Sequence, residues 1–179
     1  DDLGWSDVAC FGSSFYETPH IDRLAKEGVK FTSGYAACHV CSPTRASILT
    51  GKYPATMNLT EWLNGRSDRP YQVLLNPDKV MALDPKAITL AEVLKKEGYA
   101  TALFGKWHLG RDTSPTGHGF DLHVPHSVNS NLGRRGFYNP KKIPGLDGGE
   151  YVTDRLAELA ANYIDDNKDK PFLLYMSHF

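Results

Sequence analysis

The stretch TLAEVLKKEGYATALFGKWH, residues 89–108, joins a helix signal directly to a strand signal. Its Thr89 and Glu92 form a capping box, in which the two side chains satisfy backbone N–H groups at the start of a helix. An apolar face continues from there to Gly98, and residues 99–104 then have the composition of a strand. The stretch therefore predicts a helix that leads directly into a strand.

Helix and strand signals alternate along the rest of the chain in the same way. The other expected elements are helices over residues 18–28 and 151–167 and strands over residues 29–31 and 172–179. Two segments rich in Pro, Gly, Asn and Asp are expected to be long loops, residues 55–88 and 109–150. The alternation predicts one α/β layered domain with a largely parallel sheet, in which ligands gather at the carboxyl ends of the strands.

Two polar side chains follow the expected strand at residues 99–104. Lys106 and His108 are two residues apart on a strand-end loop, so they can converge on one side. A lysine supplies a point charge for an anion, and a histidine exchanges protons near neutral pH. Taken alone, the pair is better explained as a solvated lysine and an ordinary loop histidine. A second motif makes a functional role the better interpretation.

That motif is CSPTRASILTGKYP, which begins at Cys41 and predicts a short helix with a thiol at its start. Ser42 is expected to be the N-cap, Pro43 suits the first helical position, and Gly51 suits a left-handed end. The Cys41 side chain then faces the positive end of the helix dipole, and Arg45 adds a fixed charge about one turn further on. This arrangement is suited to holding an anion and activating a nucleophile.

The composition limits the classes of function. With 179 residues, of which 41% are hydrophobic and 23% charged, the chain has the size and composition of one soluble globular domain. A formal net charge of −1 gives no electrostatic case for nucleic acid, and no apolar run approaches the roughly 20 residues that span a bilayer. Three cysteines are too few for a disulfide scaffold, and the odd count leaves at least one thiol free or modified.

Together the two motifs resemble the signatures of the type I sulfatases. The first signature has the form Cys-x-Pro-x-Arg with a small-apolar-Thr-Gly-Lys/Arg tail, and residues 41–52 contain every element. The second runs from Gly-Tyr-x-Thr to Gly-Lys-Trp-His and matches residues 98–108, with Phe104 bulkier than usual. The resemblance covers nearly the whole chain. It implies an alkaline-phosphatase-like fold, with a largely parallel central sheet flanked by helices, and the hydrolysis of sulfate esters.

The resemblance also implies a mechanism. In the family, a formylglycine-generating maturation enzyme oxidises the signature cysteine to an aldehyde, formylglycine, and Cys41 stands at that position. The resemblance assigns Arg45 to orienting the aldehyde hydrate, Lys106 to binding the sulfate, and His108 to removing a proton from the hydrate. The hydrate attacks sulfur and expels an alcohol, and deprotonation of its second hydroxyl then expels sulfate.

Adjacent carboxylates stand at the start of the chain. Asp1 and Asp2 are oxygen donors of the kind that calcium and magnesium prefer, and sulfatases carry Asp-Asp-x-Gly after an apolar strand. The resemblance therefore implies a divalent cation, Ca²⁺ or alternatively Mg²⁺, bound by Asp1, Asp2 and the modified Cys41. Because that strand and later family ligands are missing, we expect residues 1–179 to be a partial catalytic domain, without its first strand and C-terminal part, that is inactive alone.

The remaining polar residues give weaker signals. Ser127 stands where some sulfatases carry a polar residue that touches the sulfate, so the resemblance makes it a substrate-binding candidate. His178 is expected to lie beside the site rather than in it. His118, His123 and His126 are not placed on one helix face and are expected to have surface or loop roles rather than to bind a metal.

Three functions remain open from the sequence. The first is a sulfatase that acts on a sulfated small molecule or glycan and is exported to a periplasm, a lysosome or the medium, as the resemblance implies. The second is a phosphate or phosphonate monoester hydrolase of the same superfamily. The third is a non-catalytic module in which the C-x-x-C pair, Cys38 and Cys41, binds a metal or cycles between thiol and disulfide.

Overall fold

The computed structural model describes residues 3–124, 143 and 150–179. The chain divides into two compact units, Asp1–Ala36 and Ala37–Phe179. No helix in the described part of the chain is long and apolar enough to cross a membrane.

The first unit contains one helix, α1 (Pro19–Glu27), and a preceding 3-10 turn, η1 (Ala9–Phe11). The Asp22 carboxylate on α1 accepts the backbone N–H of Cys10 at 2.8 Å, and this hydrogen bond ties η1 to α1. The helix expected over residues 18–28 is therefore confirmed.

The strand expected over residues 29–31 is wrong. Val29 and Phe31 are 78% and 76% exposed and lie in irregular chain after α1. β-Branched and aromatic residues favour a strand chiefly where neighbouring strands pack against them. No strand among the described residues pairs with this segment, so the strand preference of its residues is not reinforced by packing.

The second unit contains a parallel sheet. β1 (Ala100–Gly105) lies between β2 (Leu122–Val124) and β3 (Phe172–Ser177) and runs parallel to both. The α/β architecture with a parallel sheet and the two predicted strands are confirmed. β2 was not predicted and lies inside a segment that was expected to be a loop. Three residues are too few to show a strand pattern in the sequence.

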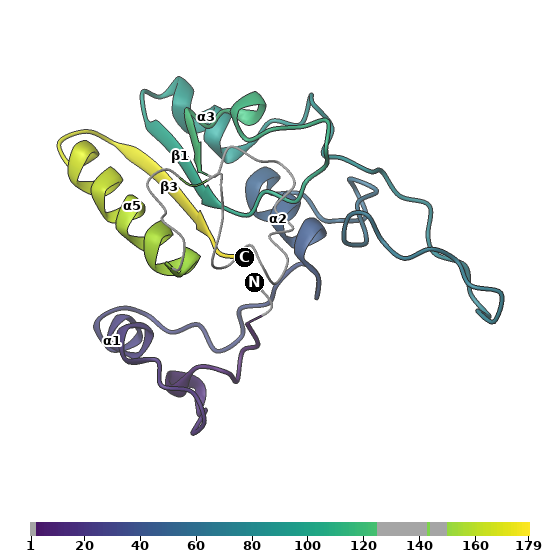
Figure 1. Ribbon diagram of the computed structural model, residues 1–179, viewed down its shortest axis with the longest axis horizontal. Coiled ribbons are helices and arrows are strands. Elements are labelled where there is room, and N and C mark those ends of the chain that lie inside the picture. Colours follow the sequence, from purple (N-terminus) through teal and green to yellow (C-terminus); the bar gives the residue numbers. More distant parts are fainter. Residues whose placement is uncertain (1–2, 125–142, 144–149) are drawn as a thin grey trace. The chain divides into compact units, whose positions relative to one another are not determined.

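Helices cover both faces of this sheet (Figure 1). α5 (Val152–Asn167) packs on one face, and α2 (Cys41–Thr50) and α3 (Leu90–Lys96) share the core on the other. Side chains of β1 alternate between the two cores: Phe104 packs under α5, and Leu103 packs under α2 and α3. The sheet is thereby buried on both sides, as is usual for parallel strands.

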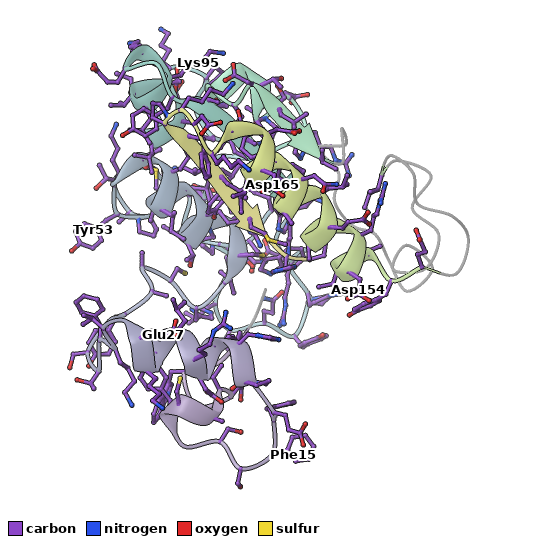
Figure 2. The ribbon with its side chains drawn as sticks, turned by 90° about the vertical axis from the view of Figure 1, so that its left-hand side faces the viewer. Phe15, Glu27, Tyr53, Lys95, Asp154 and Asp165 are labelled. Atoms are coloured by element: carbon purple, nitrogen blue, oxygen red, sulfur yellow. The ribbon has the colours of Figure 1, made fainter. Side chains whose placement is uncertain are left out.

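The helix α5 buries the face that its sequence spacing predicts. Leu156 packs in the core with side chains of the sheet, and Ala160 is also buried, but Ile164, the last residue of the expected stripe, is 43% exposed. Figure 2 shows α5 lying along the sheet, with Asp154 near its start and Asp165 near its end.

The capping box that opens α3 is also present. The Thr89 hydroxyl accepts the backbone N–H of Glu92 at 3.2 Å, and the Glu92 carboxylate accepts the backbone N–H of Thr89 at 2.8 Å. The buried Thr89 hydroxyl also donates to the carbonyl of His118 at 2.7 Å. The cap therefore fixes both the start of α3 and the chain that leads into β2.

Candidate active site

The helix α2 begins at Cys41, with Val40 at the N-cap position. The prediction that Ser42 caps the helix is wrong, because Ser42 is buried in the first turn and its hydroxyl accepts the backbone N–H of Leu63 at 3.0 Å. Gly51 ends the helix with a φ of +69°, as expected. The thiol of Cys41 therefore belongs to the first helical turn, where backbone N–H groups lack intrahelical partners.

A histidine contacts this thiol. The Sγ of Cys41 lies 3.1 Å from Nδ1 of His108, which is on the loop directly after β1. The other ring nitrogen, Nε2, contacts the backbone carbonyl of Leu63. Because a carbonyl only accepts hydrogen bonds, Nε2 carries the proton, and in a neutral ring Nδ1 keeps a lone pair that faces residue 41.

The surroundings of His108 favour this neutral form. Burial lowers the pKa of His108 below its usual 6.5, and the positive charges of Lys106 and Arg45 lower it further. The hydrogen bond to Leu63 acts in the opposite direction, because it favours the protonated ring. The net direction is downward, so the ring is a proton acceptor near neutral pH.

A buried guanidinium joins α2 to the ends of two strands. The side chain of Arg45 is only 7% exposed, and its Nη1 donates to the carbonyl of Lys106 at 2.8 Å and to the hydroxyl of Ser177. Lys106 directly follows β1, and Ser177 is the last residue of β3. These hydrogen bonds fix a positive charge close enough to His108 to lower its pKa.

A glycine allows the two strand ends to come so close. Gly105 has a φ of +109°, and a Cβ built on it would overlap the backbone carbonyl of Ser177. The same carbonyl accepts the backbone N–H of Lys106 at 2.7 Å. Glycine suits both the left-handed conformation and the close approach, so the chain can turn at the end of β1 and bring His108 to α2.

Two groups in this cluster were not predicted from the sequence. Ser177 lies at the carboxyl end of a predicted strand, one residue before His178, and that position was a usable signal. Leu63 contributes only backbone atoms from a predicted loop, and no residue type marks such a role.

The structure does not test every predicted site residue. Asp1, Asp2 and Ser127 lie outside the described residues, as does His126. Within the described ranges, no group of three or more His, Cys, Asp or Glu side chains is placed to hold a metal ion. The cation site therefore stays a prediction.

The expected surface or loop roles of His118 and His123 are wrong. Both are buried, His118 at the end of η2 (Thr116–His118) and His123 in β2. The ring of His118 lies 5.7 Å from that of Trp107, and Nε2 of His123 lies 3.4 Å from the carbonyl of Gly105. Each packs in the core of the second unit rather than at a loop surface.

The two cysteines of the C-x-x-C pair have different neighbours. Both are free thiols, as is Cys10. Cys38 Sγ lies 3.9 Å from Nδ1 of the adjacent His39, whereas Cys41 Sγ contacts His108. The structure thus places only Cys41 in the cluster of basic groups.

Comparison with known proteins identifies the family of the chain. A family model described as Sulfatase matches residues 1–178. The steryl-sulfatase of Mus musculus is 44% identical over 135 residues, which make up 70% of this chain and 21% of that protein. The N-acetylgalactosamine-6-O-sulfatase of Bacteroides thetaiotaomicron is 42% identical over 110 residues, 62% of this chain and 19% of that protein. The chain thus spans about a fifth of the length of these curated relatives.

Solved structures show the same fold. One, a complex with its substrate D-glucosamine-2-N,6-O-disulfate, has a TM-score of 0.74 and 30% identity, and the match covers 99% of this chain and 32% of that one. The crystal structure of Ps i-CgsB has a TM-score of 0.71 and 30% identity, with 99% and 43% covered. The chain belongs to the sulfatase family and has its alkaline-phosphatase-like α/β fold.

Proposed function

We propose that the protein hydrolyses sulfate monoesters to an alcohol and sulfate by means of a formylglycine made from Cys41. The observation that carries the proposal is the 3.1 Å contact between Cys41 Sγ and His108 Nδ1 at the first turn of α2. The names of the relatives that match this chain support it. Formylglycine supplies, as its hydrate, one hydroxyl for attack on sulfur and a second for release of the sulfate.

His108 is the base in this proposal. Its Nδ1 lies within hydrogen-bond reach of the atom bonded to Cβ of residue 41, which is sulfur in Cys41 and oxygen in the modified residue. The Leu63 carbonyl holds the proton on Nε2, and burial keeps the ring neutral. Nδ1 is therefore ready to accept a proton from a hydroxyl at residue 41.

Arg45 and Lys106 supply positive charge. Hydrogen bonds to Lys106 and Ser177 hold the guanidinium of Arg45, so it offsets negative charge that develops at residue 41 without having to reorganise. We assign the Lys106 ammonium to a sulfate oxygen, because its backbone is fixed at the end of β1 beside this cluster. Ser127 is a further proposed sulfate contact.

A divalent cation completes the proposal. The described groups around Cys41 are neutral or positively charged, so carboxylate ligands must come from elsewhere, and Asp1 and Asp2 are the candidates. Two carboxylates with an oxygen of modified residue 41 form a donor set that suits Ca²⁺, with Mg²⁺ as the alternative. When bound, the cation supplies charge that polarises the sulfate oxygens.

The wider biological setting follows from the same proposal. Residues 1–179 are part of one catalytic domain, and the substrate is a sulfated small molecule or a sulfated glycan. A formylglycine-generating enzyme is the maturation partner, and the protein is exported to a periplasm, a lysosome or the medium. Relatives named for steryl sulfate and for a sulfated amino sugar support this range of substrates.

The test is peptide mass spectrometry combined with a hydrolysis assay. Full-length protein, co-expressed with a formylglycine-generating enzyme, is expected to show aldehyde at residue 41 and to release p-nitrophenol faster from p-nitrophenyl sulfate than from p-nitrophenyl phosphate. Cys41→Ala abolishes both signals. Cys38→Ala is the matched control, because it removes the same group three residues away and leaves the contact with His108 intact.

Two results would count against the proposal. An unmodified thiol at residue 41, in cells that convert a control sulfatase, would exclude the formylglycine mechanism. A faster reaction with the phosphate ester would instead assign the protein to phosphate monoester hydrolysis. Cys41→Ser provides a further check, because a serine hydroxyl can accept the sulfuryl group but cannot expel it, so the variant is expected to accumulate a sulfated peptide.

A further inference from the structure

The long segment between α2 and α3 forms a hollow of about 550 Å³. Figure 1 shows this segment extending away from the sheet before it returns to α3. The side chains that line the hollow are two arginines, two aromatic residues, an amide and a hydroxyl: Trp62, Arg66, Ser67, Arg69, Tyr71 and Gln72. A hollow of this size lies within the usual range for sites that hold a small organic ligand.

The hollow begins next to the proposed catalytic cluster. Trp62, which lines it, immediately precedes Leu63. Leu63 is fixed at both backbone groups: its N–H donates to the Ser42 hydroxyl at 3.0 Å, and its carbonyl contacts the ring of His108. Trp62 in the wall of the hollow is thus the sequence neighbour of Leu63, whose carbonyl contacts His108, the proposed base.

The charge of the hollow is positive. Arg66 and Arg69 are both exposed, and within the described chain neither guanidinium is in an ion pair. The nearby Asp68 carboxylate accepts both the backbone N–H of Asn76, at 3.0 Å, and its side-chain N–H, at 2.7 Å. Asp68 keeps its negative charge between the two arginines, but its carboxylate is hydrogen-bonded to Asn76 and forms no ion pair with either guanidinium in the described chain, so both guanidinium groups can bind an anionic ligand.

A second acidic side chain of this segment is compensated by a lysine. Glu61 forms an ion pair with Lys79, and both side chains are largely buried. This pair lies where the segment leaves the fold and where it comes back. The charged side chains that line the hollow itself are those of the two arginines.

The other lining residues suit a ring rather than a lone ion. Trp62 and Tyr71 bring flat apolar surfaces with electron-rich faces, against which the C–H face of a sugar ring can pack. The Gln72 side chain accepts the backbone N–H of Arg69 and so closes the turn that contains Tyr71. Aromatic faces beside two guanidinium groups match a sugar that carries a carboxylate or sulfate.

We propose that this hollow binds an acidic sugar residue adjacent to the sulfated sugar that is cleaved, so that the preferred substrate is an oligosaccharide with at least one further anionic group. This inference rests on the proposed sulfatase function and deepens it. Trp62 and Tyr71 pack on the sugar ring, and Arg66 and Arg69 bind its carboxylate or sulfate.

Binding is tested first without turnover. Full-length protein with Cys41→Ala is titrated with a trisulfated heparin disaccharide in a calorimeter. Adding Arg66→Gln and Arg69→Gln is expected to weaken binding at least tenfold, because two charged hydrogen-bonding groups are lost. Lys96→Gln with Lys170→Gln is the matched control, since it removes the same charge from two exposed positions elsewhere and is expected to change binding less than twofold.

The role of the aromatic surface is tested separately. Tyr71→Ala is expected to weaken binding of the disaccharide about threefold to tenfold. Tyr71→Phe should restore it, because packing on a sugar ring needs the aromatic face and not the hydroxyl. Tyr71 is exposed, so neither change is expected to disturb the fold.

Kinetics then separate this inference from the proposed function. In the formylglycine-containing enzyme, the arginine double variant should raise KM for the disaccharide at least tenfold more than KM for p-nitrophenyl sulfate, which has no sugar and no second anion. Equal effects on both substrates, or binding as weak in the lysine control as in the arginine variant, would overturn the sugar site while leaving the sulfatase function intact. Failure to hydrolyse either sulfate would overturn the function, whatever the binding result.

Discussion

Replacing Ser177 by alanine removes one of the two hydrogen bonds that Arg45 makes to described residues. The donor is a charged Nη1, and both side chains are buried, each with an exposed fraction of 7%. A buried hydrogen bond to a charged group contributes about 1.5–3 kcal/mol, roughly twice the value for a neutral pair. The bond from Arg45 to the Lys106 carbonyl at 2.8 Å remains. We therefore expect a loss of about 2 kcal/mol in the free energy of unfolding rather than complete unfolding.

The same change is expected to lower kcat/KM. Arg45 can tilt away from residue 41 once Ser177 no longer holds it, and about 2 kcal/mol of lost orientation corresponds to roughly a thirtyfold slower reaction. The assays are urea unfolding of the full-length protein and hydrolysis of p-nitrophenyl sulfate. Formylglycine content is measured in each sample, so that incomplete maturation is not mistaken for slower chemistry.

Ser47→Ala is the matched control for this prediction. Ser47 lies on α2 two residues after Arg45, and its buried hydroxyl makes no hydrogen bond within the described structure. Its removal leaves no partner unsatisfied and improves helix propensity, so a change between zero and about 0.5 kcal/mol in the stabilising direction is expected. If Ser177→Ala matched Ser47→Ala in both stability and kcat/KM, the proposed role of Ser177 in positioning Arg45 would be refuted.

Two further predictions concern the sheet. Gly105→Ala should destabilise the protein by roughly 3–5 kcal/mol, because strain at positive φ adds to overlap with the neighbouring strand β3; the measurement is a lower Tm or a loss of soluble protein. The control is Gly98→Ala, which should cost only about 1–2 kcal/mol, because Gly98 has a φ of +85° but open space around it. Equal losses of stability in the two variants would contradict this reasoning. Asp121 has a pKa lowered from 3.8 by its bond to Lys95, at 2.6 Å, and by bonds from Thr101. Its contribution is therefore present above pH 3.8 and lost as the pH falls below it, so Asp121→Asn should destabilise the protein less at pH 3 than at pH 7 in urea titrations. A penalty that does not depend on pH would show that the charge of Asp121 is not what stabilises this contact.

Features that depend on neighbouring residues were predictable from the sequence. The capping box of α3 joins Thr89 to Glu92, three residues away, and the left-handed end of α2 depends on Gly51 alone. Features that depend on a distant partner were not. The strand expected at Val29 to Phe31 does not form, because no strand among the described residues pairs with it. Ser42 does not cap α2, because its hydroxyl instead accepts the backbone N–H of Leu63, which is 21 residues away.

The sequence by itself determined the chemistry of the site: a thiol at the start of a helix, an arginine one turn on, and a lysine and a histidine after a strand. Residue types and short spacings carry that information, because each motif is one continuous stretch of chain. Only the tertiary structure decided how these groups meet. The proton on His108 is placed by a carbonyl 45 residues away, and Arg45 is held by a serine 132 residues away. Ser177 is brought to Arg45 by the pairing of β3 with β1, and Leu63 is brought to His108 by the fold of the loop after α2. Neither contact leaves a local pattern from which a sequence could predict it.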